Sequence, residues 1–114
     1  MIQMKTETIQ KVKSFLEFEK GWYFGKGNEF KQEVINLAIK IINNIKYETD
    51  VFPGESGEIM VSIYNNEWYY EFIIEHDLRI DFVSYKDDVL FNYKENIDIT
   101  ESIKIITKIN SHHI

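Results

Sequence analysis

The 114-residue chain contains no cysteine, which excludes disulfide bonds and any zinc or redox site built on thiolates. Its longest apolar runs are only a few residues, too short for a membrane-spanning helix. The opening residues Met1–Lys5 do not resemble a signal peptide. We therefore expect a cytoplasmic protein of bacterial or phage-like type.

The negative charge is concentrated in one part of the chain. A chain of this length is expected to form one domain, residues 1–114, and its formal net charge is −6. Residues 1–47 carry eight lysines and five acidic residues, whereas residues 48–101 carry three basic and 14 acidic residues. The second part therefore has an excess of eleven negative charges, which repels the nucleic-acid backbone and attracts basic partners. Direct binding to nucleic acid is disfavoured.

Apolar and polar residues alternate almost without a break between Gly57 and Tyr93. Because successive side chains of a strand point to opposite faces, this period of two predicts an antiparallel sheet with one apolar face. The residues of that face are Ile59, Val61, Ile63, Trp68, Tyr70, Phe72, Ile74, Leu78, Ile80, Phe82, Val89, Phe91 and Tyr93.

Three connections define a register for four strands. Asn65-Asn66 is predicted as a two-residue hairpin turn, because asparagine tolerates positive φ. The next loop must contain an odd number of residues if the apolar residues of the two strands are to lie on the same face of the sheet. The three residues Glu75–Asp77 meet this condition. Asp87-Asp88 is predicted to turn the chain again. The predicted opposite pairs are Ile63 with Trp68, Val61 with Tyr70, Ile59 with Phe72, Phe72 with Ile80, Tyr70 with Phe82, and Phe82 with Tyr93.

Three amphipathic helices are predicted around the sheet. The first spans Met4–Lys20 and the second spans about Glu29–Lys46. The last begins after Asp98, which forms a capping box with Glu101. Residues Tyr47–Ser56, which contain the only proline, are predicted to carry the chain to the sheet. The predicted fold class is α+β in the order αα-ββββ-α, a four-stranded antiparallel meander with the helices packed on one face.

A glycine-rich loop and the start of the sheet carry a resemblance. Gly21-Trp22-x-x-Gly25 precedes the second helix, and Pro53-x-x-x-Gly57-x-Ile59 opens the sheet. Over roughly residues 8–83 the chain resembles a loose group of short acidic bacterial proteins with a Gly-Trp-Asp-Gly-type loop and a Pro-x-x-x-Gly-x-Ile sheet start. Tyr23 stands where that pattern usually has an acidic residue. The resemblance implies small operon-borne proteins, of the kind found beside toxins or defence genes, and no catalytic residues.

No group of residues predicts catalysis. His76 lies in a predicted turn and His112-His113 lie near the C-terminus, so none is placed beside the serine or aspartate that a hydrolase requires. The segment Gly54–Gly57 leads into a strand and lacks the strand-to-helix context of a nucleophile elbow. Gly21–Gly27 lacks the Gly-Lys-Ser/Thr ending of a phosphate loop.

Two acidic turns are the candidate metal contacts. Asp87-Asp88 and His76-Asp77 offer ligands that a hard cation accepts. Each turn supplies only two neighbouring ligands, which are too few to hold an ion. We therefore expect both turns to be solvated and free of metal. No metal site and no cofactor are predicted.

Trp22, Tyr23 and Phe24 are consecutive aromatic residues in a loop with three glycines. They are predicted to form a plug over the edge of the core, and the alternative is a ligand cage. In that alternative the protein is a small ligand-sensing domain or enzyme. Its pocket would lie between the helices and the sheet, around Trp22, Tyr23, Trp68 and Tyr70.

The opposite face of the predicted sheet combines apolar side chains with carboxylates. In the predicted register Glu71 lies directly opposite Asp81, an arrangement of like charges that destabilises a sheet. Aromatic residues surrounded by charge are typical of a protein interface, although the C-terminal helix or a second subunit could instead cover this face. The candidate partner-binding residues are Tyr64, Tyr69, Glu71, Ile73, Glu75, Asp81, Val83 and Tyr85.

The favoured function is a non-catalytic protein-binding module. An acidic inhibitor or adaptor would dock on a basic surface of a partner protein, such as the nucleic-acid groove of a toxin or nuclease. Antitoxins, immunity proteins and phage counter-defence proteins share this mechanism, and the sequence does not separate them. The alternatives are the ligand-sensing domain or enzyme described above and a self-associating structural protein, such as a homodimer.

Overall fold

The computed structural model describes residues 2–111, so His112-His113 lie outside the described residues. The elements in chain order are α1 (Ile2–Ser14), the short 3₁₀ helix η1 (Phe15–Glu17), α2 (Gln32–Asn44), β1 (Thr49–Pro53), β2 (Ile59–Asn65), β3 (Trp68–Ile74), β4 (Ile80–Lys86), β5 (Val89–Ile97) and α3 (Ile99–Asn110). The five strands form one antiparallel sheet in the order β1-β2-β3-β4-β5. The α+β class is therefore confirmed, and the predicted number of four strands is wrong.

The additional strand, β1, lies in the segment that the sequence assigned to a connection. Val51 is buried and pairs with Val61 of β2, while Asp50 and Phe52 on either side are exposed. Pro53 ends the strand at the sheet edge, a position where a missing N–H costs least. One inward residue in a five-residue strand is too short a pattern to indicate a strand from sequence.

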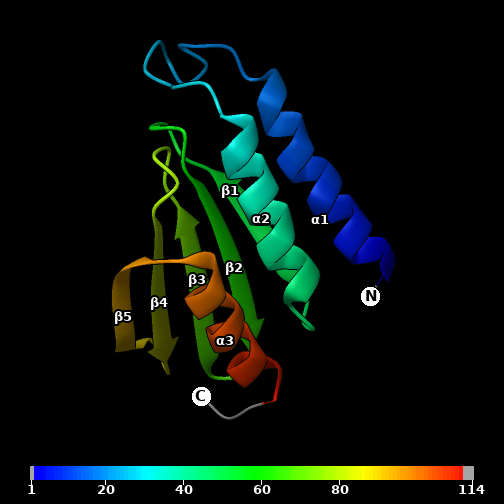
Figure 1. Ribbon diagram of the computed structural model, residues 1–114, viewed down its shortest axis with the longest axis vertical. Helices are drawn as coiled ribbons and strands as arrows, with labels where there is room; N and C mark the ends of the chain where they lie inside the picture. The colour runs from blue at the N-terminus through cyan, green and yellow to red at the C-terminus, as the bar shows by residue number, and fades with distance from the viewer. Residues whose placement is uncertain (1, 112–114) are drawn as a thin grey trace.

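The three α-helices lie on the same side of the sheet (Figure 1). We call this side the inner face and the opposite side the outer face. The inner face and the helices bury one continuous core, in which Phe72 and Phe82 are the large central residues, with ring centroids 4.9 Å apart. The sheet contributes Val51, Ile59, Val61, Ile63, Tyr70, Phe72, Ile74, Ile80 and Phe82 to this core.

The first hairpin is shifted by two residues from the predicted register. Asn65 pairs with Trp68, so the turn consists of Asn66-Glu67, with Asn66 at a φ of 60°. Ile63 therefore faces Tyr70 instead of Trp68. A shift of two residues keeps every side chain on its predicted face, because the period of a strand is two.

The second connection, unlike the first, is longer than predicted. Five residues, Glu75–Arg79, join β3 to β4, an odd number as the matching of faces requires, and Phe72 pairs with Phe82. Glu71 consequently lies opposite Val83, and Asp81 lies opposite Ile73. The predicted pairing of Glu71 with Asp81 is wrong.

The third turn is Asp87-Asp88 as predicted, with both residues at positive φ. Two irregularities in β5 then change which face its residues occupy, so Phe82 pairs with Lys94 instead of Tyr93. Tyr93 pairs with Val83 on the outer face, contrary to the predicted inward pattern. Val89 is on the predicted face, in line with Lys86 and Trp68, but both Val89 and Phe91 are exposed.

The first two helices are shorter than predicted. The first leaves α-helical geometry after Ser14, where Phe15, Phe18 and Phe30 gather into an aromatic cluster with centroids 5.5–5.9 Å apart. The capping of α3 is confirmed, because Asp98 Oδ1 accepts a hydrogen bond of 2.7 Å from the Glu101 N–H. In the described part of the chain, none of the helices has the length and hydrophobicity that crossing a membrane requires.

Candidate interface on the outer face of the sheet

A row of aromatic side chains crosses the outer face. Tyr64, Tyr69 and Tyr85 occupy opposite positions on β2, β3 and β4, and Leu90 extends the row onto β5. The ring centroids of Tyr64 and Tyr69 are 4.7 Å apart, and those of Tyr69 and Tyr85 are 6.1 Å apart. Tyr64 is 76% exposed. We call Tyr64, Tyr69 and Tyr85 the tyrosine row.

Two carboxylates accept hydrogen bonds from tyrosines on the same face. The Tyr69 hydroxyl donates to Glu71 Oε1 over 2.5 Å, and the Tyr93 hydroxyl donates to Glu95 Oε1 over 2.9 Å. Both pairs are two residues apart, the spacing that places strand side chains on one face. Burial raises the pKa of Tyr69 to about 12, and the bond to Glu71 acts in the same direction. The bond to Glu95 is the main cause that raises the pKa of Tyr93.

Asp81 and Glu75 differ from these carboxylates. Asp81 is only 7% exposed, and its Oδ1 accepts the backbone N–H of Asn96 over 2.9 Å, with Arg79 Nε 3.8 Å away. It therefore holds the irregular part of β5 in place. Burial, followed by repulsion from Glu58, raises the pKa of Glu75 above its ordinary value, and Arg79 opposes this increase.

The predicted partner-binding residues consequently form two groups. The tyrosine row, Glu71, Ile73 and Val83 lie together on the outer face, where Glu71, Ile73 and Val83 are half-buried. Asp81 and Glu75 lie toward the end of β3 and the start of β4, and Asp81 is almost inaccessible. The sequence analysis missed Tyr93 and Glu95. Tyr93 faces outward because of an irregularity in β5, and the alternation of apolar and polar residues does not indicate that irregularity.

Few of the carboxylates are neutralised within the chain. Among residues 2–111 three ion pairs form, namely Lys11–Asp50 and Lys94–Glu101, each at 3.2 Å, and Arg79–Asp81 at 3.8 Å. Most of the 14 acidic residues between positions 48 and 101 therefore keep an uncompensated charge.

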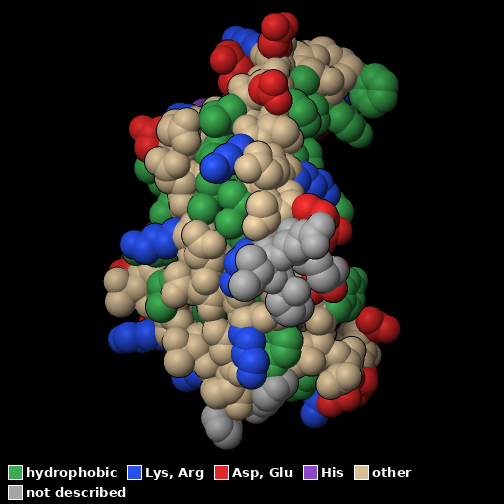
Figure 2. Space-filling model, turned by 90° about the vertical axis from the view of Figure 1, so that its right-hand side faces the viewer, with side chains coloured by type: hydrophobic (Ala, Val, Ile, Leu, Met, Phe, Trp, Pro, Cys, Tyr) green, Lys and Arg blue, Asp and Glu red, His purple; other side chains and the backbone are tan. Residues whose placement is uncertain are grey.

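Trp22 closes the edge of the core. Its indole N–H donates to the Asn28 carbonyl over 2.7 Å, and its ring centroid lies 4.8 Å from that of Phe18 and 5.8 Å from that of Phe30. Tyr23 is exposed and Phe24 is 88% exposed, so neither contributes to this plug. Hydrophobic side chains protrude at the upper end of the molecule, where this loop lies (Figures 1 and 2).

The alternative pocket around Trp22, Tyr23, Trp68 and Tyr70 is not assembled. The loop of Trp22 is bound to the connection that leads into the start of β2, through the Asn28 N–H and the Glu55 carbonyl at 2.7 Å. Trp68 lies at the other end of the sheet, opposite the last residue of β2, where it stacks on Tyr70. A cavity of about 530 Å³ beside Trp22 and Tyr23 is lined by Pro53 and Glu55 and contains neither Trp68 nor Tyr70.

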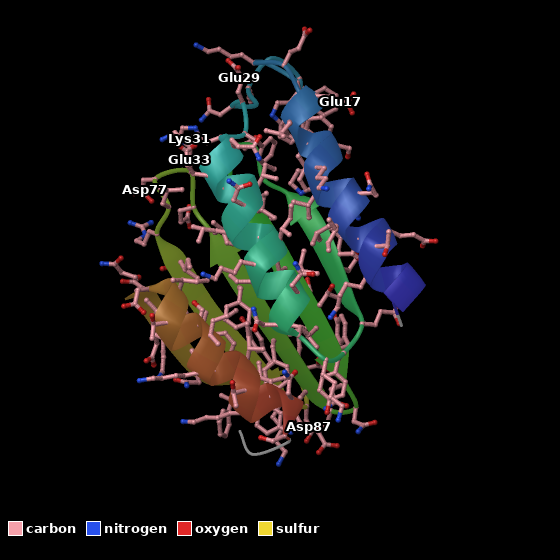
Figure 3. The ribbon with its side chains drawn as sticks, turned by 45° about the vertical axis from the view of Figure 1, so that its right-hand side comes forward. Glu17, Glu29, Lys31, Glu33, Asp77 and Asp87 are labelled. Atoms are coloured by element: carbon pink, nitrogen blue, oxygen red, sulfur yellow. The ribbon has the colours of Figure 1, made fainter. Side chains whose placement is uncertain are left out.

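The two candidate metal turns lie far apart. Asp77 is at the upper end of the sheet and Asp87 at the lower end (Figure 3). Within the described residues, no three or more histidine, aspartate or glutamate side chains gather into a group that could hold a metal ion.

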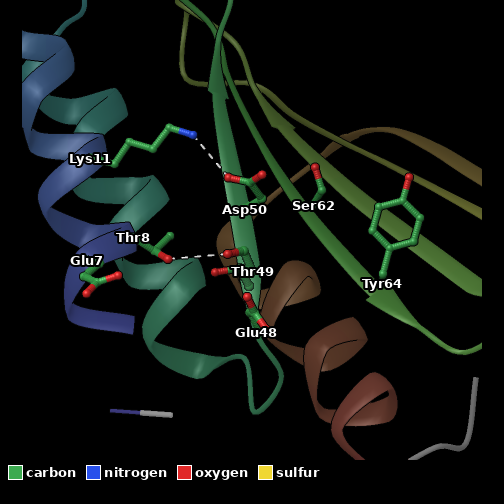
Figure 4. Close-up of a pocket in the computed structure, with 8 residues that line it drawn as sticks. All are labelled: Glu7, Thr8, Lys11, Glu48, Thr49, Asp50, Ser62 and Tyr64. Atoms are coloured by element: carbon green, nitrogen blue, oxygen red, sulfur yellow. Dashed lines mark hydrogen bonds and ion pairs between the residues drawn. The ribbon is translucent and has the colours of Figure 1, made fainter. Parts of the chain in front are cut away.

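The tyrosine row adjoins a groove at the β1 edge of the sheet (Figure 4). The groove has a volume of about 540 Å³ and lies between α1 and strands β1 and β2. It shares Tyr64 with the tyrosine row.

Comparison of the chain with known protein families, with curated proteins and with solved structures finds no match. The resemblance described from the sequence therefore stays a prediction, and the geometry of the chain itself is the basis for the function proposed next.

Proposed function

We propose that this protein is a non-catalytic binding module, an inhibitor or adaptor whose outer sheet face docks on a basic surface of a partner protein. The observation that carries the proposal is the tyrosine row, three aromatic side chains on neighbouring strands of a sheet face that the described helices leave open. Tyrosine is enriched at interface hot spots because its ring buries apolar area and its hydroxyl keeps a hydrogen bond.

The hydrogen bonds of the face favour a pre-formed surface. Glu71 and Glu95 are held by the hydroxyls of Tyr69 and Tyr93, each through one carboxylate oxygen, Oε1. A carboxylate that is already oriented loses less conformational entropy when a partner binds. The open carboxylate oxygens can then accept hydrogen bonds from lysine or arginine.

The charge distribution favours a basic partner. Of the 14 acidic residues between positions 48 and 101, nine lie in the connections and turns that join the elements, and Asp50, Glu71, Asp81 and Glu95 lie on the strands. Few of these charges are paired internally. Complementary charge accelerates association and fixes the orientation of binding. A surface that normally contacts nucleic acid meets these requirements, so antitoxins, immunity proteins and phage counter-defence proteins are the classes of protein that fit.

Site-specific photocrosslinking in the native host tests the proposal. A benzophenone amino acid replaces Tyr85 in the row or, as a matched control, the exposed aromatic Phe24 in the distant loop. We expect a crosslinked protein with a basic surface from position 85 and none from position 24. A crosslink only from position 24, or a captured partner without a basic surface, contradicts the proposal.

The salt dependence of binding provides a second test with the captured partner. The Debye length is about 8 Å at physiological ionic strength, so added salt screens the long-range attraction. We expect association to slow steeply between low and high salt while dissociation changes little. Free DNA or RNA should not bind at physiological salt, because like charges repel. A salt-independent association rate, or sub-micromolar binding to free nucleic acid, contradicts the proposal.

A further inference from the structure

The groove beside the tyrosine row combines acidic and aromatic groups from three separate segments (Figure 4). Helix α1 forms one wall, β1 forms the other, and β2 continues from β1 onto the outer face. The residues that line it are Glu7, Thr8, Lys11, Glu48, Thr49, Asp50, Ser62 and Tyr64. Three carboxylates and one ammonium give the groove a formal charge of −2.

Lys11 shows how a cation is held at one end of this groove. Its ammonium lies 3.2 Å from Asp50 Oδ1 and 5.2 Å from the centroid of the Phe52 ring. Asp50 Oδ1 also accepts the Val51 N–H, which leaves Oδ2 without a partner among the described residues. Neither Glu7 nor Glu48 forms an ion pair within residues 2–111. Two carboxylates and one further oxygen are thus open to a second cation.

Ser62 provides an independent sign that a ligand belongs here. It lines the groove between Asp50 and Tyr64 and is only 3% exposed. Its Oγ is buried and makes no hydrogen bond of regular geometry within residues 2–111, although it lies close enough to the Tyr69 hydroxyl to act against the rise in the pKa of that tyrosine. A buried hydroxyl without such a bond is destabilising, and a donor that enters the groove can supply one.

We propose that this groove binds the guanidinium group of an arginine side chain on the partner protein. The inference rests on the proposed function, because the groove continues the same binding face through Tyr64. Acceptors on two walls suit a planar group with five N–H donors better than the point charge of a lysine ammonium. The exposed ring of Tyr64 adds a surface on which a guanidinium can stack.

The test uses the whole chain and needs no partner. Nα-acetyl-arginine methylamide is titrated into the ¹⁵N-labelled protein, with the lysine analogue and the neutral citrulline analogue as controls. We expect saturable shifts at the amides of Thr8, Thr49 and Ser62 with the arginine probe. The lysine probe should bind more weakly, and the citrulline probe should leave these amides unchanged because it has the same shape without the charge.

Two charge variants sharpen the result. Glu48→Gln should weaken binding of the arginine probe about 1.4-fold to fivefold, the range for one exposed ion pair. Glu67→Gln is the matched control, because it removes an exposed carboxylate from the β2–β3 turn outside the groove. The same spectra establish that each variant is folded.

The possible outcomes separate the two proposals. The absence of shifts in the groove, equal shifts with citrulline, or no effect of Glu48→Gln overturns the arginine site. If the partner still crosslinks from position 85, only the arginine site is lost. If the probe binds the groove but no partner crosslinks from position 85, the proposed interface is lost and the arginine site remains.

Discussion

The two faces of the same sheet differ in what constrains their residues. On the inner face, side chains such as Phe72 and Ile74 are fully buried against the helices, and each must fill a defined volume. On the outer face, the tyrosine row is partly exposed, and the hydroxyls of Tyr69 and Tyr93 bind carboxylates instead of core atoms. The inner face is thus constrained by folding, whereas the aromatic and acidic residues of the outer face need another explanation, which the proposed binding partner would supply.

Truncation of one aromatic on each face should give the largest contrast. Phe72→Ala leaves a cavity in the core and should lower the free energy of unfolding by about 3–5 kcal/mol. Tyr85→Ala removes a half-buried ring and should cost about 1 kcal/mol or less. Urea denaturation measures both values. Equal losses would mean that the outer face is part of the stabilising core.

Trp22 and Phe24, two residues apart in the glycine-rich loop, offer the same contrast between a half-buried and an exposed aromatic side chain. Trp22→Ala removes the plug and its hydrogen bond to Asn28, so it should cost about 2–3 kcal/mol, less than for a fully buried aromatic. Phe24→Ala should change stability by no more than about 0.5 kcal/mol, because the ring lies in solvent. Thermal melts compare the two. A Trp22→Ala variant as stable as the wild type would assign Trp22 to a binding site instead.

The sequence predicts the inner face well but not the details of the outer face. The alternation from Ile59 to Phe82 identifies the inward residues of the strands, because any register shifted by two keeps them inward. The same property hides the true register, since a turn at Asn65-Asn66 and one at Asn66-Glu67 match the faces equally well. The predicted Glu71–Asp81 pair is wrong because the second connection has five residues instead of three, and both lengths match the faces. The predicted inward position of Leu78 is wrong, because Leu78 lies in the connection between β3 and β4 and is exposed.

Other features depend on contacts between distant segments. The orientation of Tyr93 depends on the irregularity between the Tyr85–Leu90 and Ser84–Asn92 pairs, which no local pattern reveals. The groove combines residues near positions 7–11, 48–50 and 62–64 that only the folded chain brings together. The α3 cap, by contrast, is a local signal and is predicted correctly.

Substitutions of Asp81 and Glu71, the two acidic residues of the predicted pair, should differ in their effect on the free energy of unfolding. Asp81→Ala removes a side chain that is only 7% exposed and leaves the part-buried Asn96 N–H without its acceptor, so it should cost about 1–3 kcal/mol. Glu71→Ala removes a partner of the half-exposed Tyr69 hydroxyl, which water can replace, so it should cost less than about 1 kcal/mol. Chemical denaturation should rank them in this order. The reverse order would place Glu71 in the fold and Asp81 on the surface.

The smallest expected effect is a pKa difference between neighbouring tyrosines on the two faces. Burial raises the pKa of both Tyr69 and Tyr70 to about 12, but only Tyr69 also donates to Glu71. Glu71→Gln should therefore lower the pKa of Tyr69, keep it above 10 and leave Tyr70 unchanged. NMR of ¹³C-labelled tyrosine follows both. An equal change at Tyr70 would contradict the assignment of the two faces.

These raised pKa values also give the sign of the alkaline pH dependence. The folded chain holds the phenolic protons more tightly than the unfolded chain, whose tyrosines titrate near 10. The stabilisation is fully present below pH 10 and should be lost as the pH rises from about 10 to about 12.

The most direct measurement compares stability and partner affinity in one double variant, Tyr69→Ala with Tyr85→Ala, using the partner identified by crosslinking. If the outer face serves binding, the melting temperature should fall by less than about 10 °C. The dissociation constant should rise at least about 100-fold, as for the loss of two central aromatic anchors. Phe24→Ala is the control that should leave both values unchanged. An unchanged affinity in a folded double variant, or the loss of folding itself, would show that the tyrosine row is not the binding surface.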